Sequence, residues 1–154
     1  MGHLEDSSLV VRPLMNSYSV VCGSPSYFQQ HGIPVLPSDL QEHNCLPFNP
    51  RSHQTVWRFL HRGGVIEIPV SGNFGVSSLS LLRDAALDGV GLVFIPQWFV
   101  QTEIDNGHLQ VLDFESLVMP VHAVFANHRY LAPKIRAFID FLVDHIPQKY
   151  LDIR

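Results

Sequence analysis

The most informative pattern of apolar and polar positions lies in residues 85–96, which read AALDGVGLVFIP. The first residues are typical of a helix end and the glycines of a turn, and an unbroken apolar strand then runs to Pro96. A strand without polar alternation must be covered on both faces, which favours an α/β layer structure. Ligands of such sheets usually bind beyond the carboxyl ends of the strands. The pattern therefore predicts both a fold class and an edge where a site can lie.

Shorter apolar runs predict the other strands of the chain. They are expected over residues 8–14, 18–22, 45–48, 55–61, 65–70, 109–112 and 121–126. The runs at 55–61 and 65–70 predict a hairpin around Arg62-Gly63-Gly64. Apolar residues alternate in the second of these runs, so one face of that strand is expected to be buried, and Pro69 favours an edge or a strand end.

Five helices are predicted from their start and stop residues and from a period of about 3.6 residues. They span residues 25–31, 37–44, 77–87, 97–105 and 133–146. Ser24 and Pro25 are typical of an N-cap followed by proline at the first helical position, and Gly32 is typical of a stop. The last helix has the clearest apolar face, formed by Ile135, Phe138, Ile139, Leu142, Val143 and Ile146.

Composition and charge narrow the classes of function. Of the 154 residues 46% are hydrophobic and only 16% charged, so some apolar surface is expected to meet a partner. The net charge of −4 argues against nucleic-acid binding by this chain alone. No apolar segment is long enough to span a membrane, no secretory signal is visible, and Cys22 and Cys45 lie in apolar runs. We therefore expect a cytoplasmic chain with buried, reduced thiols and no membrane partner.

Several motifs along the chain resemble those of the C-terminal sensor domain of LysR-type transcriptional regulators. They are the segments 6–14, 22–34 with its SPSY and HGIP, 39–46 with its DL and HNCL, 85–96, and 133–142. Each motif alone is weak, but their order and spacing together are specific, and the match extends from about residue 6 to residue 146. The whole chain thus resembles part of one regulatory family.

The resemblance implies one lobe of a type 2 periplasmic-binding-protein-like fold, which is an α/β lobe with a mixed, mostly parallel sheet flanked by helices. It implies a single partial domain over 1–154, with a second lobe at about 20–120 and a returning strand and helix at about 121–147. The family's helix-turn-helix and most of its first lobe find no counterpart here, so DNA contact is expected only through that missing N-terminal domain. The implied function is effector sensing, in which a small, anionic organic molecule bound between two lobes controls transcription without a cofactor.

The segment Ser71-Gly72-Asn73-Phe74 is the first candidate for the effector site. Its backbone N–H groups and the positive end of the following helix can attract a carboxylate. Ser71 and Asn73 can add side-chain hydrogen bonds, and Phe74 can add an apolar contact. A helix cap formed by Ser77 or a neighbour explains the same polar residues equally well.

Three other places complete the predicted site. Phe48 and Asn49 follow one strand, and Ile95 and Pro96 end another, so these residues share one edge if the sheet is mostly parallel. Ser24 lies at the crossover between the lobes that the resemblance implies. Plain core is the alternative for Ile95, and a helix cap is the alternative for Ser24.

Signals for other kinds of chemistry are weak. The nine histidines show no recognised metal-ligand spacing, and Leu79 stands where a nucleophile elbow starting at Gly75 needs its second glycine. We therefore expect neither a metal site nor an enzyme. The alternative function is assembly, because in the family the last helix covers the first lobe. Without that lobe its apolar face is expected to bind a second copy, by packing or by swapping.

Overall fold

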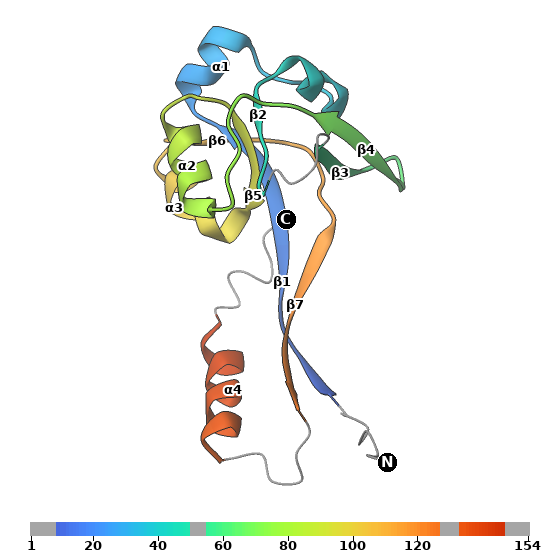
Figure 1. Ribbon diagram of the computed structural model, residues 1–154, viewed down its shortest axis with the longest axis vertical. Coiled ribbons are helices and arrows are strands. Elements are labelled where there is room, and N and C mark those ends of the chain that lie inside the picture. Colours follow the sequence, from blue (N-terminus) through green and yellow to red (C-terminus); the bar gives the residue numbers. More distant parts are fainter. Residues whose placement is uncertain (1–8, 50–54, 127–132, 147–154) are drawn as a thin grey trace, which may run out of the picture. The chain divides into compact units, whose positions relative to one another are not determined.

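The computed structural model describes residues 9–49, 55–126 and 133–146 (Figure 1). Its elements are β1 (Leu9–Gly23), α1 (Pro25–His31), the 3₁₀ helix η1 (Pro37–Glu42), β2 (Cys45–Leu46), β3 (Thr55–His61), β4 (Gly64–Val70), α2 (Leu79–Leu87), β5 (Leu92–Pro96), α3 (Gln97–Asp105), β6 (Gln110–Leu112), β7 (Val118–Ala126) and α4 (Pro133–His145). The chain forms two compact units, which we call the main unit (residues 18–118) and the terminal unit (residues 1–17 with 119–154).

The sheet of the main unit has the strand order β2-β5-β1-β6. β2 and β5 are parallel, with Cys45 opposite Leu92. β1 runs antiparallel to β5, with Val20 opposite Ile95, and it is also antiparallel to β6. The mixed α/β class is confirmed, but the expectation of mostly parallel pairs is wrong for these strands. The cause is the direction of β1, which enters the sheet beside the carboxyl end of β5 and therefore runs opposite to it.

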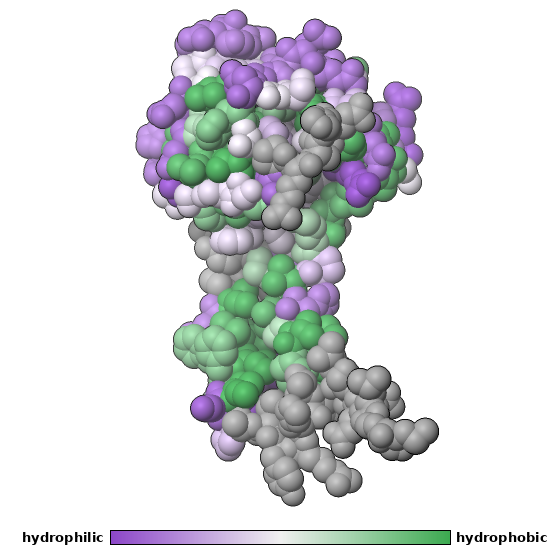
Figure 2. Space-filling model, viewed as in Figure 1, coloured by the Kyte–Doolittle hydropathy of each residue, from purple (hydrophilic) through white to green (hydrophobic). Residues whose placement is uncertain are grey.

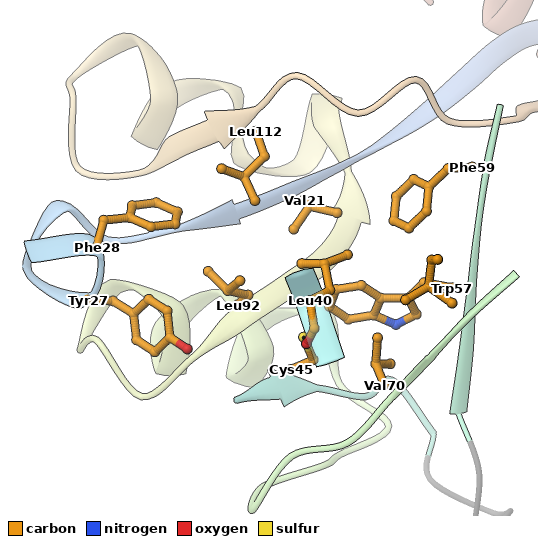
Figure 3. Packing of buried hydrophobic residues seen from close by; sticks show 11 residues of the cluster. Val21, Tyr27, Phe28, Leu40, Cys45, Trp57, Phe59, Val70, Leu92 and Leu112 are labelled. Carbon is orange, nitrogen blue, oxygen red and sulfur yellow. The ribbon is translucent and has the colours of Figure 1, made fainter. Parts of the chain in front are cut away.

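The apolar strand β5 is covered on both faces, as its lack of polar alternation predicts. Leu92 belongs to a cluster of buried residues that also holds Trp57 (Figure 3). Val93 and Ile95 belong to a second cluster, in which Leu82 of α2 is buried. Neighbouring residues of a strand point to opposite faces, so β5 lies between the two halves of the core.

The ends of the helices follow their capping residues. α1 begins after Ser24, whose Oγ accepts a hydrogen bond from the Tyr27 N–H at 3.3 Å. α2 begins at residue 79 rather than 77, because the Oγ of Ser78 caps it by accepting a hydrogen bond from the Leu81 N–H at 3.4 Å. The helix expected over 37–44 is a shorter 3₁₀ helix, and α3 spans the expected residues.

The expected hairpin is present as β3 and β4. Arg62 and Gly63 form a two-residue turn with φ values of 50° and 79°. Both values lie in the left-handed region, and this kind of turn matches the twist of antiparallel strands. Ile68 and Val70 are buried whereas Pro69 between them is exposed, so the predicted alternation in β4 is confirmed.

The terminal unit contains the first part of β1, its partner strand β7 and helix α4. Ile139 of α4 is buried, and Asp140 forms an ion pair with Arg12 of β1, with Oδ1 and Nη1 2.9 Å apart. Phe138 and Phe141 on the same helix are 60% and 52% exposed. Apolar residues are visible at the surface of this unit, in green, in Figure 2. The apolar face predicted for the last helix is therefore only partly covered.

Candidate functional site

The segment 71–77, which connects β4 to α2, lies along the outer edge of β2. The Cys45 N–H donates a hydrogen bond to the Ser71 carbonyl at 2.9 Å. Further along, Phe48 and Val76 form an isolated parallel bridge. These contacts hold the loop beside the strand end where the sequence predicted a second part of the site.

Asn44 holds the same loop through its side-chain amide, from the amino end of β2. Its Nδ2 donates to Asn73 Oδ1 at 2.8 Å and to the Val90 carbonyl at 2.6 Å. Its Oδ1 accepts a hydrogen bond from the Asn73 N–H at 2.9 Å. We call these three hydrogen bonds the Asn44 clasp. Gly72 passes so close to this strand that a Cβ atom there would overlap the Cys45 carbonyl group, so the path of the loop depends on glycine at this position.

Asn49 contacts the segment from the carboxyl end of β2. Its φ of 53° lies in the left-handed region, which asparagine tolerates better than most residues. Its Oδ1 accepts a hydrogen bond from Ser77 Oγ at 3.1 Å, and its N–H donates to the Val76 carbonyl at 3.0 Å. Phe48 and Phe74 are 49% and 40% exposed. The structure thus places polar groups and exposed aromatic surface along one edge of β2.

Ile95 and Pro96 end β5, which runs parallel to β2, so this strand end lies on the same side of the sheet as Phe48 and Asn49, as expected for parallel neighbours. The side chain of Ile95 is fully buried in the core cluster with α2 and α3. This agrees with the alternative that the sequence left open, in which Ile95 is a core residue. Pro96 ends β5, pairs with Ser19 and precedes α3.

Ser24 lies at the opposite end of these strands from Pro96, because β1 and β5 are antiparallel, and its Oγ caps α1. This is the end of the sheet at which Asn44 precedes β2. Among the described residues no hydrogen bond joins the Ser24 side chain to the loop, and the Ile95 side chain packs in the core.

Tyr27 connects the clasp to the core. Its hydroxyl accepts a hydrogen bond from the Asn44 N–H at 3.0 Å and lies 3.1 Å from Nδ1 of His43. Its ring stacks on His31, with the ring centroids 4.5 Å apart. Burial raises the pKa of Tyr27, whereas burial and then the nearby His31 lower the pKa of His43. The loop is therefore tied, through Asn44, to a small polar cluster at the end of α1.

Sequence reasoning missed both Asn44 and this cluster. In the sequence, Asn44 was noted only as part of the HNCL motif and Tyr27 only as part of SPSY, and neither was given a role at the site. The signal that could have found Asn44 is its position, since it comes directly before a buried strand, where backbone groups leave the sheet. Gly72 and Gly91 are further signals, because a Cβ atom at either position would overlap backbone atoms of residues 44–45.

The described part of the chain holds no arrangement typical of metal or thiol chemistry. In residues 9–49, 55–126 and 133–146 no three His, Cys, Asp or Glu side chains gather closely enough to hold a metal ion. Cys22 and Cys45 are free and buried, as expected, and burial raises the pKa of each thiol to about 12. Such thiols stay protonated at neutral pH and are poor nucleophiles. No helix of this part is long and apolar enough to cross a membrane.

A mixed α/β fold with polar groups and exposed aromatic surface at the carboxyl end of a strand is an arrangement in which α/β proteins bind ligands. The family described as the LysR substrate binding domain matches residues 1–147, and the chain belongs to this family. The resemblance seen in the sequence is thereby confirmed. Relatives of the chain are HTH-type transcriptional regulators, and this family is not one of enzymes.

The chain is similar in sequence to two curated transcriptional regulators. The chain is 32% identical over 148 residues to the HTH-type transcriptional regulator CrgA of Neisseria meningitidis serogroup B, covering 94% of the chain and 49% of CrgA. It is 30% identical over 145 residues to DmlR of Escherichia coli K12, covering 93% of the chain and 47% of DmlR. The chain therefore spans about half the length of the curated relatives it matches.

Solved structures support the same fold. The regulatory domain of CrgA superposes with a TM-score of 0.79 at 31% identity, covering 93% of this chain and 72% of that one. Full-length AphB, a virulence activator of Vibrio cholerae, gives a TM-score of 0.79 at 24% identity, covering 94% of this chain and 50% of AphB. At that identity the second likeness bears on the fold alone.

Proposed function

We propose that this chain senses a small, anionic organic effector through residues 71–74, with Phe48 and Asn49 beside them, and thereby controls transcription. The observation that carries the proposal is the Asn44 clasp, which fixes an exposed loop along the edge of β2. Ser71 and Asn73 are exposed there and can donate hydrogen bonds, and Phe74 adds aromatic surface. A carboxylate attached to an apolar body fits such a mixture of groups.

The arrangement of the whole regulator belongs to the same proposal. Residues at about 20–120 form the second lobe, and those at about 121–147 form the returning strand and helix. The compact main unit, residues 18–118, supports this division. The loop is then one wall of a cleft whose other wall belongs to a first lobe, and DNA is contacted by a helix-turn-helix domain outside this sequence. Both CrgA and DmlR are named as HTH-type regulators.

Calorimetric titration tests this function. Phenylacetate is a suitable probe, because it combines a carboxylate for Asn73 with a ring for Phe74. We expect weak binding by this chain and tighter binding by a version extended by any coding sequence that precedes Met1 in frame. Asn73→Ala should weaken binding, whereas Asn106→Ala, at the distant end of α3, should not. Equally tight binding by both versions would contradict a cleft with two walls, and the absence of binding by either would contradict this effector class.

A second candidate function, assembly, is favoured by one observation on the terminal unit. Val124, Phe138 and Phe141 are each more than half exposed there, although they are large and apolar. Such a surface is typical of an interface, and a second copy of the chain carries the same surface. Light scattering should show self-association that Phe138→Ser weakens, whereas Val35→Ser, at an exposed apolar residue of the main unit, should not. A monomer at high concentration would rule this function out.

A further inference from the structure

We propose that Asn44 is a positioning residue that fixes the side-chain amide of Asn73 with its NH₂ group outward, so that the loop selects ligand groups with oxygen acceptors. This inference rests on the proposed effector site, because it concerns which chemical groups the site accepts. Asn73 is the residue that touches the ligand, and Asn44 acts through Asn73. The orientation of each amide is fixed by which of its partners can donate a hydrogen bond and which can accept one.

The orientation of the Asn44 amide is set by two backbone groups. One end of the amide lies 2.6 Å from the Val90 carbonyl, which can only accept, so this end must be the NH₂ group. The other end lies 2.9 Å from the Asn73 N–H, which can only donate, so that end must be the carbonyl oxygen. The two constraints agree, and an exchanged orientation would set a donor against a donor and an acceptor against an acceptor.

The orientation of Asn73 follows from that of Asn44. The second N–H of Asn44 Nδ2 points at the Asn73 side chain, 2.8 Å from its nearest atom, which must therefore be the acceptor Oδ1. Nδ2 of Asn73 is then on the outer side of a planar amide, and it makes no hydrogen bond to any other described residue. Because Asn73 is exposed, its two N–H groups are offered to whatever binds the loop. A carboxylate accepts such hydrogen bonds and an ammonium group cannot.

Asn44 itself is held by backbone hydrogen bonds on the side that faces the core. The backbone N–H of Asn44 donates to the hydroxyl of buried Tyr27 at 3.0 Å, and its carbonyl accepts from the Leu92 N–H at 2.8 Å. Gly91 lies against the same carbonyl, and a Cβ atom there would overlap it. Asn44 is therefore attached to the rigid sheet on one side and to the loop on the other. A fixed amide selects among ligand groups more strongly than one that can rotate, since less order has to be gained on binding.

Two variants separate positioning from contact. Asn44→Ala removes the clasp but leaves Asn73 in place. Asn73→Asp keeps the clasp, because a carboxylate oxygen and the backbone N–H still meet Asn44, but it replaces the outward donor by a charged acceptor. Asn106→Ala is the matched control, since its side chain makes no hydrogen bond among the described residues. The probes are phenylacetate and 2-phenylethylammonium, which are similar in size and opposite in charge.

Two-dimensional NMR of the whole chain supplies both readouts, the hydrogen exchange of the Asn73 amide and the shifts caused by each probe. We expect Asn44→Ala to speed exchange by about fivefold or more, in keeping with the loss of one ordinary hydrogen bond, while Asn73→Asp and the control keep it slow. Phenylacetate should shift the peaks of residues 71–75 in the original chain and the control. Its affinity should fall at least fivefold in Asn44→Ala, and Asn73→Asp should reverse the preference towards 2-phenylethylammonium.

Three results would overturn the inference in distinguishable ways. Equal Asn73 exchange with and without the Asn44 side chain would show that the clasp does not form, whatever the probes do. Unchanged phenylacetate binding by Asn73→Asp would show that the outward NH₂ group does not select the ligand. A protected Asn73 amide in a loop that responds to neither probe would overturn the selectivity and would locate the failure in the proposed effector site, because the clasp would be intact.

Discussion

The main unit and the terminal unit differ in how much apolar surface they bury. The main unit has two clusters of buried side chains, one on each face of β5. In the terminal unit, Ile139 is the one apolar side chain that is buried among the residues that the structure describes. Val124, Phe138 and Phe141 of that unit are mostly exposed. The same chain therefore holds a well-packed unit and a thinly packed one.

The difference in buried apolar surface predicts a difference in stability between the two units. β1 and β7 with α4 have the elements of a fold, but a two-stranded sheet is marginally stable in water unless more strands or helices cover it. In the main unit β5 meets this need, because buried side chains lie on both of its faces. We therefore expect the stability of the chain to reside in the main unit.

The largest effect should follow from a cavity in the main unit. Leu92→Ala removes a fully buried side chain, and we expect the free energy of unfolding to fall by about 2–5 kcal/mol. Urea unfolding followed by tryptophan fluorescence measures it, since both tryptophans, Trp57 and Trp98, lie in the main unit. Phe138→Ala removes a larger side chain from the terminal unit and should change this free energy by about 0.5 kcal/mol or less. Similar losses of unfolding free energy for the two variants would contradict the difference in packing between the two units.

A second effect comes from added volume rather than lost volume. A Cβ atom in Gly91→Ala would meet the Asn44 carbonyl and the Leu46 side chain, with Leu46 Cγ only 3.0 Å away. We expect a loss of about 1–3 kcal/mol in the free energy of unfolding, because the packed strands around it cannot move apart freely. Gly64→Ala is the control, since its nearest neighbour would be the His61 carbonyl at 3.9 Å. If both glycines tolerate alanine, the main unit is packed less tightly than its burial indicates.

Local patterns in the sequence were sufficient for the parts of the fold that depend on neighbours along the chain. The unbroken apolar run of β5, the caps of α1 and the turn at Arg62-Gly63 are all of this kind. The direction of β1 is not, because its pairing with β5 joins segments far apart in the sequence. Its length was also missed, since Asn16 and Ser17 favour turns by themselves and are held extended within one long strand.

For the candidate site too, local patterns in the sequence predicted the individual segments but not the contacts between distant segments. Turn residues indicated the loop at 71–74, and a strand end indicated Asn49, and the structure brings both to the edge of β2. Ser24 caps α1, and its role at the effector site stays a prediction, because it rests on the crossover that the resemblance implies. The role of Asn44 could not be read from the sequence, because its amide joins two other segments of the chain, at Asn73 and Val90.

A smaller effect should appear as a pH dependence of the main unit. Burial and then His31 lower the pKa of His43 below 6.5, although Asp39 and Glu42 oppose this shift. Between the lowered pKa and 6.5 the unfolded chain binds more protons than the folded chain, so the free energy of unfolding should fall as the pH falls through this range. Urea unfolding at a series of pH values measures it. His43→Gln should flatten that part of the profile, and an unchanged slope would place the titration elsewhere.

The smallest effect should come from the ion pair of the terminal unit. Arg12 and Asp140 are 2.9 Å apart but 45% and 48% exposed, so water screens their attraction. A double-mutant cycle of Arg12→Ala and Asp140→Ala, read from hydrogen exchange of the α4 amides, should give a coupling of about 0.2–1 kcal/mol that decreases in high salt. The matched pair Arg58 and Glu67, at 2.8 Å in the exposed hairpin of the main unit, should give a similar value. A much larger coupling in the terminal unit alone would mean that charge holds α4 where apolar packing is thin. The two units would then differ in the kind of interaction that stabilises them as well as in its amount.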